Sequence, residues 1–219
     1  MDHGFWEERW QRGEIGFHQP HIHAQLQKFW PGLGLGKGST VFVPLAGKSR
    51  DMAWLAERGH LVIGAELSET AVRAFFDESS LTPTVRSSGA FQIFESGPYK
   101  IYQGDFFELP AESLRSVAAC YDRAALIALP PAMRTQYART LAALLPGEVQ
   151  ILTISIEYPE GEIKGPPFSV PAGEVKALFS DEFKISILEE RDALAASDNL
   201  KQRGVTMLSE TAYLLRRRA

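Results

Sequence analysis

The chain has 219 residues, of which 45% are hydrophobic and 23% charged, and its formal net charge is −4. These values are ordinary for a soluble globular protein of one domain, and they give no electrostatic reason to expect a nucleic-acid partner. No apolar stretch approaches the ~20 residues of a membrane span, and the N-terminus lacks a signal-peptide pattern. The single cysteine, Cys120, excludes an intrachain disulfide, so we expect a cytoplasmic protein.

Residues 1–36 carry apolar side chains at mixed helical spacing, which predicts an N-terminal helical cap interrupted around Gly13–Gly16. Alternating strands and helices follow. Ser68 is a candidate N-cap, Pro131 suits a first helical position, and Gly59 a helix end. The expected strands cover residues 41–45, 61–66, 99–103, 117–121 and 149–156, and the expected helices cover 50–58, 69–77 and 131–145. This alternation favours a parallel sheet with helices on both faces.

The C-terminal third departs from this alternation. Residues 158–171 are rich in proline and glycine and form a loop long enough to act as a lid. After a short helix over 172–179, the strand-like runs 183–190 and 207–216 are expected to pair antiparallel. A further hairpin is expected around Ser96-Gly97-Pro98. The predicted α/β fold is a single domain over residues 1–219. Its seven-stranded sheet is mostly parallel with an antiparallel last strand, which resembles the class I methyltransferases.

The most informative segment runs from Val41 to Glu66. An apolar strand leads into a small-residue turn containing Gly47, then a helix, then a second apolar strand that ends in Glu66. In α/β proteins such a turn lets the backbone approach a nucleoside cofactor, and an acid ~20 residues further on accepts hydrogen bonds from the ribose. Glu66 is therefore the candidate ribose ligand; its alternative role is a surface residue that caps the next helix.

The same turn excludes two other cofactor classes. Gly47-Lys48-Ser49 resembles the end of a phosphate-binding Walker A loop, but Phe42 occupies the position of that loop's first glycine. A dinucleotide fingerprint needs three glycines, and this turn has one. The glycines Gly32, Gly34, Gly36 and Gly38 precede the strand and cannot present amides at its carboxyl end. S-adenosylmethionine is the commonest nucleoside cofactor without a pyrophosphate, so it is the expected ligand.

Two further strand ends carry candidate residues. Asp105 and Phe106 follow the third strand, where a polar and an apolar group can hold the edge and the face of an adenine; Asp105 could instead be a turn residue. Arg123 ends the fourth strand, at the edge where open α/β sheets bind ligands. It could hold the cofactor carboxylate or lie beside the reacting sulfur, or it could form only an ion pair with Asp122.

Other chemistries find little support. His18, His21 and His23 lack the i, i+4 pairing of a helical zinc site, and no cysteine or carboxylate accompanies them, so no metal is expected. No serine or cysteine lies in a nucleophile elbow. Aromatic side chains near both ends, including Phe17 and Phe168, suit a flat apolar substrate or a sulfonium. Helix packing alone could account for Trp6 and Trp10.

Six segments together resemble the thiopurine S-methyltransferase family over nearly the whole chain: Phe5–Trp10, Phe17–Gln19, Phe42–Lys48, Arg58–Glu69, Tyr121–Leu126 and Gly165–Phe168. The run Pro-Leu-x-Gly-Lys is specific to this branch. The resemblance implies that Phe17 borders the substrate, with Phe168 in the lid. It also implies S-adenosylmethionine contacts from Trp10, Leu45, Glu66, Asp105, Phe106 and Arg123.

The implied reaction is methyl transfer from S-adenosylmethionine to the sulfur of an aromatic or heterocyclic thiol, with Arg123 favouring the thiolate. A small enzyme with a closing lid can act alone, so we expect a monomer. Two alternatives stay open: an acceptor such as a selenium or tellurium species or a small aliphatic thiol, and a non-catalytic binding protein. Two positions depart from the family. Ala46 stands where many members have cysteine. Asn199 falls near a second arginine of some members, so that role is not transferred to Lys201 or Arg203.

Overall fold

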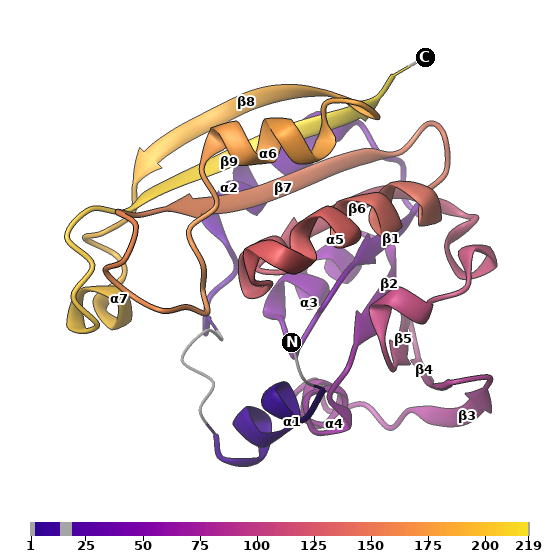
Figure 1. The fold of residues 1–219 in the computed structure, drawn as a ribbon. Helices are drawn as coiled ribbons and strands as arrows, with labels where there is room; N and C mark the ends of the chain where they lie inside the picture. Colours follow the sequence, from indigo (N-terminus) through magenta and orange to yellow (C-terminus); the bar gives the residue numbers. More distant parts are fainter. Residues whose placement is uncertain (1–2, 14–18, 219) are drawn as a thin grey trace.

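A computed structural model describes residues 3–13 and 19–218 (Figure 1). Its described residues form one mixed sheet in the order β3-β4-β5-β2-β1-β6-β7-β9-β8. The strands are β1 (Thr40–Val43), β2 (Leu61–Glu66), β3 (Thr84–Ser88), β4 (Phe91–Ser96), β5 (Tyr99–Gln103), β6 (Val117–Arg123), β7 (Gln150–Glu157), β8 (Phe183–Asp192) and β9 (Ser209–Arg217). The helices are α1 (His3–Gln11), α2 (Ala24–Phe29), α3 (Arg50–Glu57), α4 (Glu69–Glu78), α5 (Pro131–Leu144), α6 (Ala172–Phe179) and α7 (Asp198–Gln202).

The predicted strand directions are confirmed. β1 pairs in parallel with β2 and β6, β2 with β5, and β6 with β7. β9 lies antiparallel between β7 and β8. The predicted hairpin at Gly97 joins β4 to β5. The strand number differs from the expected seven, because β3 and β4 extend the sheet as an antiparallel ribbon beyond β5. β3 is exposed at every position, so it lacks the apolar alternation that predicts a strand.

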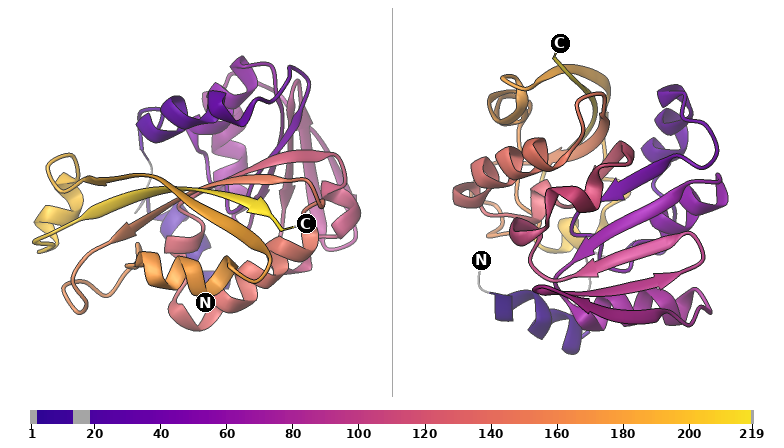
Figure 2. Two further views of the ribbon diagram at one scale, coloured as in Figure 1. Left: turned by 90° about the horizontal axis from the view of Figure 1, so that it is seen from above. Right: turned by 90° about the vertical axis from the view of Figure 1, so that its right-hand side faces the viewer.

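The sheet is covered on both faces, as predicted (Figure 2). One core cluster includes side chains of α5 and α6, and another includes side chains of α2, α3 and α4. α2 is therefore part of the main core, because Leu26 and the following Trp30 are buried in it. α1, also part of the expected N-terminal cap, lies beside α4, where Glu7 accepts a hydrogen bond from Thr70. Among the described residues, no helix has the length and apolar character needed to cross a bilayer.

Local signals account for several boundaries. The Ser68 hydroxyl accepts a hydrogen bond from the Ala71 amide and caps α4, as its residue type predicts. Pro131 occupies the first turn of α5, where its missing N–H costs nothing. Gly59 has a φ of 91°, a left-handed conformation that suits glycine just after the end of α3.

Hydrogen bonds within the loop of residues 158–171, and from it to neighbouring segments, fix its position. The Tyr158 hydroxyl donates to the Pro167 carbonyl at 2.8 Å, and the Ser169 hydroxyl bonds both the amide and the carbonyl of Tyr158. The Phe168 amide donates to the Ile127 carbonyl at 2.7 Å. Arg203, which belongs to the β8–β9 connection, donates a hydrogen bond of 3.0 Å to the Pro166 carbonyl. These bonds hold the loop beside the carboxyl ends of β6 and β7.

Candidate active site

A cavity of about 360 Å³ lies along the carboxyl ends of the parallel strands. We call its two parts the β2 side and the β9 side, after the strands nearest each. The β2 side is lined by Trp6, Trp10, Leu45–Ser49, Glu66, Leu67 and Asp105–Phe107. The β9 side is lined by Arg123, Ala124, Ile127–Leu129, Met133, Ile154, Ile156, Pro166, Pro167, residues 196–200, Leu208 and Glu210. One cavity therefore extends along the sheet edge from the end of β2 to the start of β9.

Glu66 is the buried acid of the β2 side. Its Oε2 accepts the Gly47 amide at 2.7 Å, and its Oε1 accepts the Ser68 amide at 2.9 Å. Burial raises the pKa of Glu66 above its ordinary value, although the bonds from Ser68 and Gly47 act in the opposite direction. Each oxygen keeps a further acceptor position, because a carboxylate has about four. The side chain is thus placed to accept two hydroxyl groups, as a ribose would offer.

The turn after β1 is conformationally unusual. Leu45 has a φ of 45° and Gly47 a φ of 54°, both in the left-handed region. Such a conformation is costly for a branched side chain and tends to occur at functional sites. At Gly47, a Cβ would lie 3.2 Å from the Trp10 ring, so α1 closes over the turn. The cavity wall here consists of closely approaching backbone, with no run of amides that could cradle a phosphate.

Asp105 and Phe106 follow β5, as predicted. The Asp105 carboxylate accepts the Phe107 amide at 2.9 Å and so caps a short helical turn, Phe106–Glu108. Phe106 is buried, with its ring stacked on Phe42 at 6.4 Å between centroids. Both residues line the cavity. Asp105 is therefore a turn residue, as the alternative stated, and it is also exposed to a ligand in the cavity.

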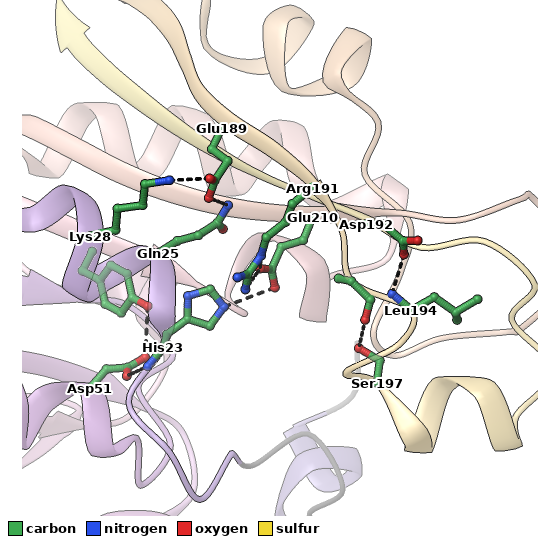
Figure 3. Close-up of polar contacts among 12 residues, drawn as sticks. His23, Gln25, Lys28, Asp51, Glu189, Arg191, Asp192, Leu194, Ser197 and Glu210 are labelled. Atoms are coloured by element: carbon green, nitrogen blue, oxygen red, sulfur yellow. Dashed lines mark hydrogen bonds and ion pairs between the residues drawn. The ribbon is translucent and has the colours of Figure 1, made fainter.

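Arg123 reaches the cavity from the end of β6, and its ion pair is with Asp51, 3.8 Å away, rather than with Asp122. The Asp51 carboxylate is buried and also accepts the His23 amide at 2.9 Å and the Tyr121 hydroxyl at 3.0 Å (Figure 3). Among the described residues, none accepts a hydrogen bond from the Arg123 guanidinium. Its donors therefore remain for a ligand. The role of Asp51 was missed because its sequence position, in the first turn of α3, is also typical of a plain helix start.

Two other predicted site residues, Phe17 and Phe168, are not among the described residues of the cavity wall. Phe17 lies outside the described residues, as does His18. Phe168 is absent from the cavity wall, since its ring lies over the buried Arg134, 5.8 Å from the guanidinium carbon. The neighbouring Pro166 and Pro167 line the cavity instead. On the β8–β9 connection, Asn199 lines it and Arg203 does not.

The described histidines of the N-terminal segment, His21 and His23, do not share one site. His21 lines the cavity, and the His23 ring contacts Glu210. Within the described ranges, no group of three or more His, Cys, Asp or Glu side chains is arranged to hold a metal ion. Cys120 is a buried free thiol inside β6, and burial raises its pKa well above the ordinary value. A buried neutral thiol is a poor nucleophile.

Known structures share this architecture. A Burkholderia thailandensis 1,6-didemethyltoxoflavin-N1-methyltransferase with bound S-adenosylhomocysteine superposes with a TM-score of 0.65 at 14% identity, covering 98% of this chain and 86% of its own. A SAM-dependent methyltransferase from Anabaena variabilis gives 0.64 at 14% identity, covering 99% and 95%. The fold is therefore that of the class I methyltransferases.

The particular family follows from sequence. The family model described as thiopurine S-methyltransferase (TPMT) matches residues 1–218. Thiopurine S-methyltransferases from Azotobacter vinelandii and Xanthomonas axonopodis pv. citri are 46% and 48% identical over 218 residues, covering 100% of each chain. The chain belongs to the thiopurine S-methyltransferase family.

Asp122 gives a prediction about stability. It points away from Arg123 and accepts the Tyr137 hydroxyl at 3.0 Å in the core. Burial raises its pKa from 3.8 to about 6, against the effect of the Tyr137 bond. The folded chain therefore holds this proton more tightly than the unfolded chain. The resulting stabilisation is complete below about pH 4 and is lost as the pH rises through about 6.

Asp122→Asn should remove this dependence, because the amide stays neutral at every pH. The free energy of unfolding in urea, variant minus wild type, should rise by up to about 3 kcal/mol between pH 4 and pH 8, from about two pKa units. Tyr137→Phe serves as the control that removes the hydrogen bond and keeps the carboxyl. The same Asp122→Asn difference at both pH values would contradict the assignment.

Proposed function

We propose that this protein transfers the methyl group of S-adenosylmethionine to the sulfur of an aromatic or heterocyclic thiol. The observation that carries the proposal is the shared cavity, with a buried ribose-type acid, Glu66, on one side and Arg123 on the other; among the described residues, the Arg123 guanidinium has an ion-pair partner in Asp51 and no hydrogen-bond acceptor. The family membership supports the same reaction. The alternative of a non-catalytic binding protein is disfavoured by Arg123, which a cofactor-binding role alone does not require on the β9 side.

The β2 side fits S-adenosylmethionine. Glu66 would accept the ribose hydroxyls, while Asp105 and Phe106 would hold the edge and the face of the adenine. Trp10 and Leu45 would close over the ligand from α1 and from the turn. When bound, the cofactor supplies a sulfonium methyl group, whose bond to the donor sulfur breaks as the new sulfur–carbon bond forms.

Arg123 is the residue we assign to the acceptor. It cannot act as a base, because its pKa exceeds 12. Its positive charge favours the thiolate, whose proton leaves to solvent before transfer, and its planar donors can orient the sulfur. Catalysis then depends mainly on orientation and on exclusion of water, since an aromatic thiolate is already a good nucleophile.

The walls of the β9 side suit a flat apolar acceptor, because Ile127, Met133, Ile154 and Pro167 line it. We propose that Phe17 borders this acceptor, and that the loop 158–171, with Phe168 behind its wall, serves as the lid. The cavity is lined by residues of one chain, which supports a monomer. The free thiol of Cys120 fits a protein of the reducing cytoplasm.

The test is a methyl-transfer screen with radiolabelled S-adenosylmethionine over aromatic thiols, aliphatic thiols, selenite and tellurite. Aromatic and heterocyclic thiols should react fastest. Faster transfer to selenite, tellurite or small aliphatic thiols would favour that acceptor class instead. Tight binding of S-adenosylmethionine without transfer to any acceptor would indicate a binding protein.

A further inference from the structure

Glu210 is a further charged side chain on the β9 side of the cavity, and it has no part in the reaction described so far. Glu210 is the second residue of β9, and its side chain is 14% exposed. Figure 3 shows its carboxylate between the His23 ring and the Arg191 guanidinium. An anion at this position is costly unless it is well paired, so its partners determine what it can do.

The partners of Glu210 leave one acceptor position open. Oε1 accepts two hydrogen bonds from Arg191, at 2.9 Å from Nε and 2.6 Å from Nη2. Oε2 accepts one from His23 Nε2 at 3.2 Å. Among the described residues, these are the donors that contact the carboxylate. A carboxylate has about four acceptor positions, so one remains on Oε2.

The charge of Glu210 is maintained by the same contacts. Burial acts to raise the pKa of Glu210, but the hydrogen bond from His23 and the charge of Arg191 more than offset it, and the net pKa lies below the ordinary value. The carboxylate is therefore ionised at neutral pH. It neither needs nor supplies a proton in the reaction.

Sheet register places Glu210 on the same face as Arg123. Arg123 pairs with Ile154 of β7, and Ile154 pairs with Ala212 of β9, two residues beyond Glu210. The backbones of Arg123 and Glu210 are thus separated by two strand spacings, about 9.6 Å, and by about 6.8 Å along the strands. Ile154 and Ile156 line the cavity between them. A cation with open donors and an anion with one open acceptor position flank an apolar floor.

We propose that Glu210 is a specificity-determining residue, which accepts a hydrogen bond from a ring N–H of a planar heterocyclic thiolate whose sulfur lies at Arg123. The inference rests on the proposed S-methyl transfer and names its acceptor class. Thiols without a ring N–H leave the Oε2 position without a donor in a cavity that excludes water, which is unfavourable. Selenite and tellurite would place a negative charge near a fixed carboxylate.

Two bicyclic thiols of nearly the same shape test the proposal. The thiolate of 2-mercaptobenzimidazole keeps a ring N–H at the position where the thiolate of 2-mercaptobenzothiazole has sulfur. In Glu210→Gln, the amide oxygen should face Arg191, so the NH₂ group replaces Oε2 and presents a donor. We expect kcat/KM for the benzimidazole to fall roughly 10- to 100-fold and that for the benzothiazole less than about 3-fold.

Glu189→Gln is the matched control. Glu189 lies on the neighbouring strand β8 and pairs with Lys28 and Gln25, but it is not part of the cavity wall (Figure 3). It should leave the ratio of the two rates unchanged. Equal losses for both thiols in Glu210→Gln would overturn the proposal and leave Glu210 a purely structural residue.

Calorimetry with both thiols, in the presence of S-adenosylhomocysteine, separates this proposal from the reaction itself. A selective loss of benzimidazole affinity in Glu210→Gln supports the recognition role even if no methyl transfer occurs. If Glu210→Gln does not fold, Glu210→Asp retracts the carboxylate while keeping its charge, and it should weaken the benzimidazole selectively. Equal binding losses in that variant would again overturn the proposal.

Discussion

Arg123→Ala should lower kcat/KM for an aromatic thiol by roughly 100- to 1000-fold, the loss typical of removing one preorganised electrostatic group from an active site. The guanidinium has a charge partner in Asp51 but no hydrogen-bond acceptor among the described residues, so its donors are available to the thiolate. Arg123→Lys keeps the charge and loses the planar donors, and its loss should be intermediate. The measurement is steady-state kinetics with the thiol varied.

The pH profile makes this prediction specific. Without Arg123 the thiol should ionise less readily in the site, so the loss should be larger at low pH and smaller where the free thiol is already ionised. Arg139→Ala removes an exposed arginine of α5 and should change neither rate nor profile. The same rate as wild type across the pH range in Arg123→Ala would refute the assignment.

Glu66→Ala should weaken S-adenosylmethionine binding by about 100-fold, since two hydrogen bonds to a charged group are lost together. The amides of Gly47 and Ser68 also lose their acceptor, which loosens the turn that meets the ligand. Glu66→Gln keeps the shape and should lose about 10-fold. Calorimetry measures both affinities directly.

The same acid predicts a pH dependence of binding. Burial raises the pKa of Glu66, so its carboxyl takes up a proton at a higher pH than an exposed glutamate would. The ionised form is the better acceptor of ribose hydroxyls. Affinity should therefore fall as the pH is lowered towards that raised pKa, and Glu66→Gln should not show this fall. Glu69→Gln, at an exposed ion pair with Arg73, is the control; an identical pH dependence in Glu66→Gln would contradict the ribose role.

Sequence patterns predicted the features that depend on chain order. The strand ends at Glu66 and Arg123, the Ser68 cap and the antiparallel C-terminal pair each follow from residue type or apolar periodicity within a short window. Family resemblance added Trp10 and Leu45, which no local pattern indicated. Both line the cavity beside Glu66.

What sequence could not predict depends on contacts between distant segments. Asp51 meets Arg123, and His23 meets Glu210 across 187 positions of the chain, so no local pattern joins either pair. The left-handed φ of Leu45 is imposed by the surrounding structure, since leucine does not favour it. One signal was available: Glu210 is a charged residue on the face of β9 that also carries the buried Ala212 and Leu214.

Because β9 runs antiparallel to β7, a C-terminal segment of the chain contributes to the acceptor wall, whereas the cofactor wall comes from earlier residues. A parallel strand there would end at the cavity, whereas β9 begins at it, so the β8–β9 connection and Glu210 enter the acceptor wall together. The residues assigned to the cofactor all lie before position 124. An exchange of the segment after β7 should therefore alter one part of the acceptor wall, while Arg123 and the residues assigned to the methyl donor stay unchanged. Chimeras joined after β7 would reveal whether acceptor preference moves with that segment.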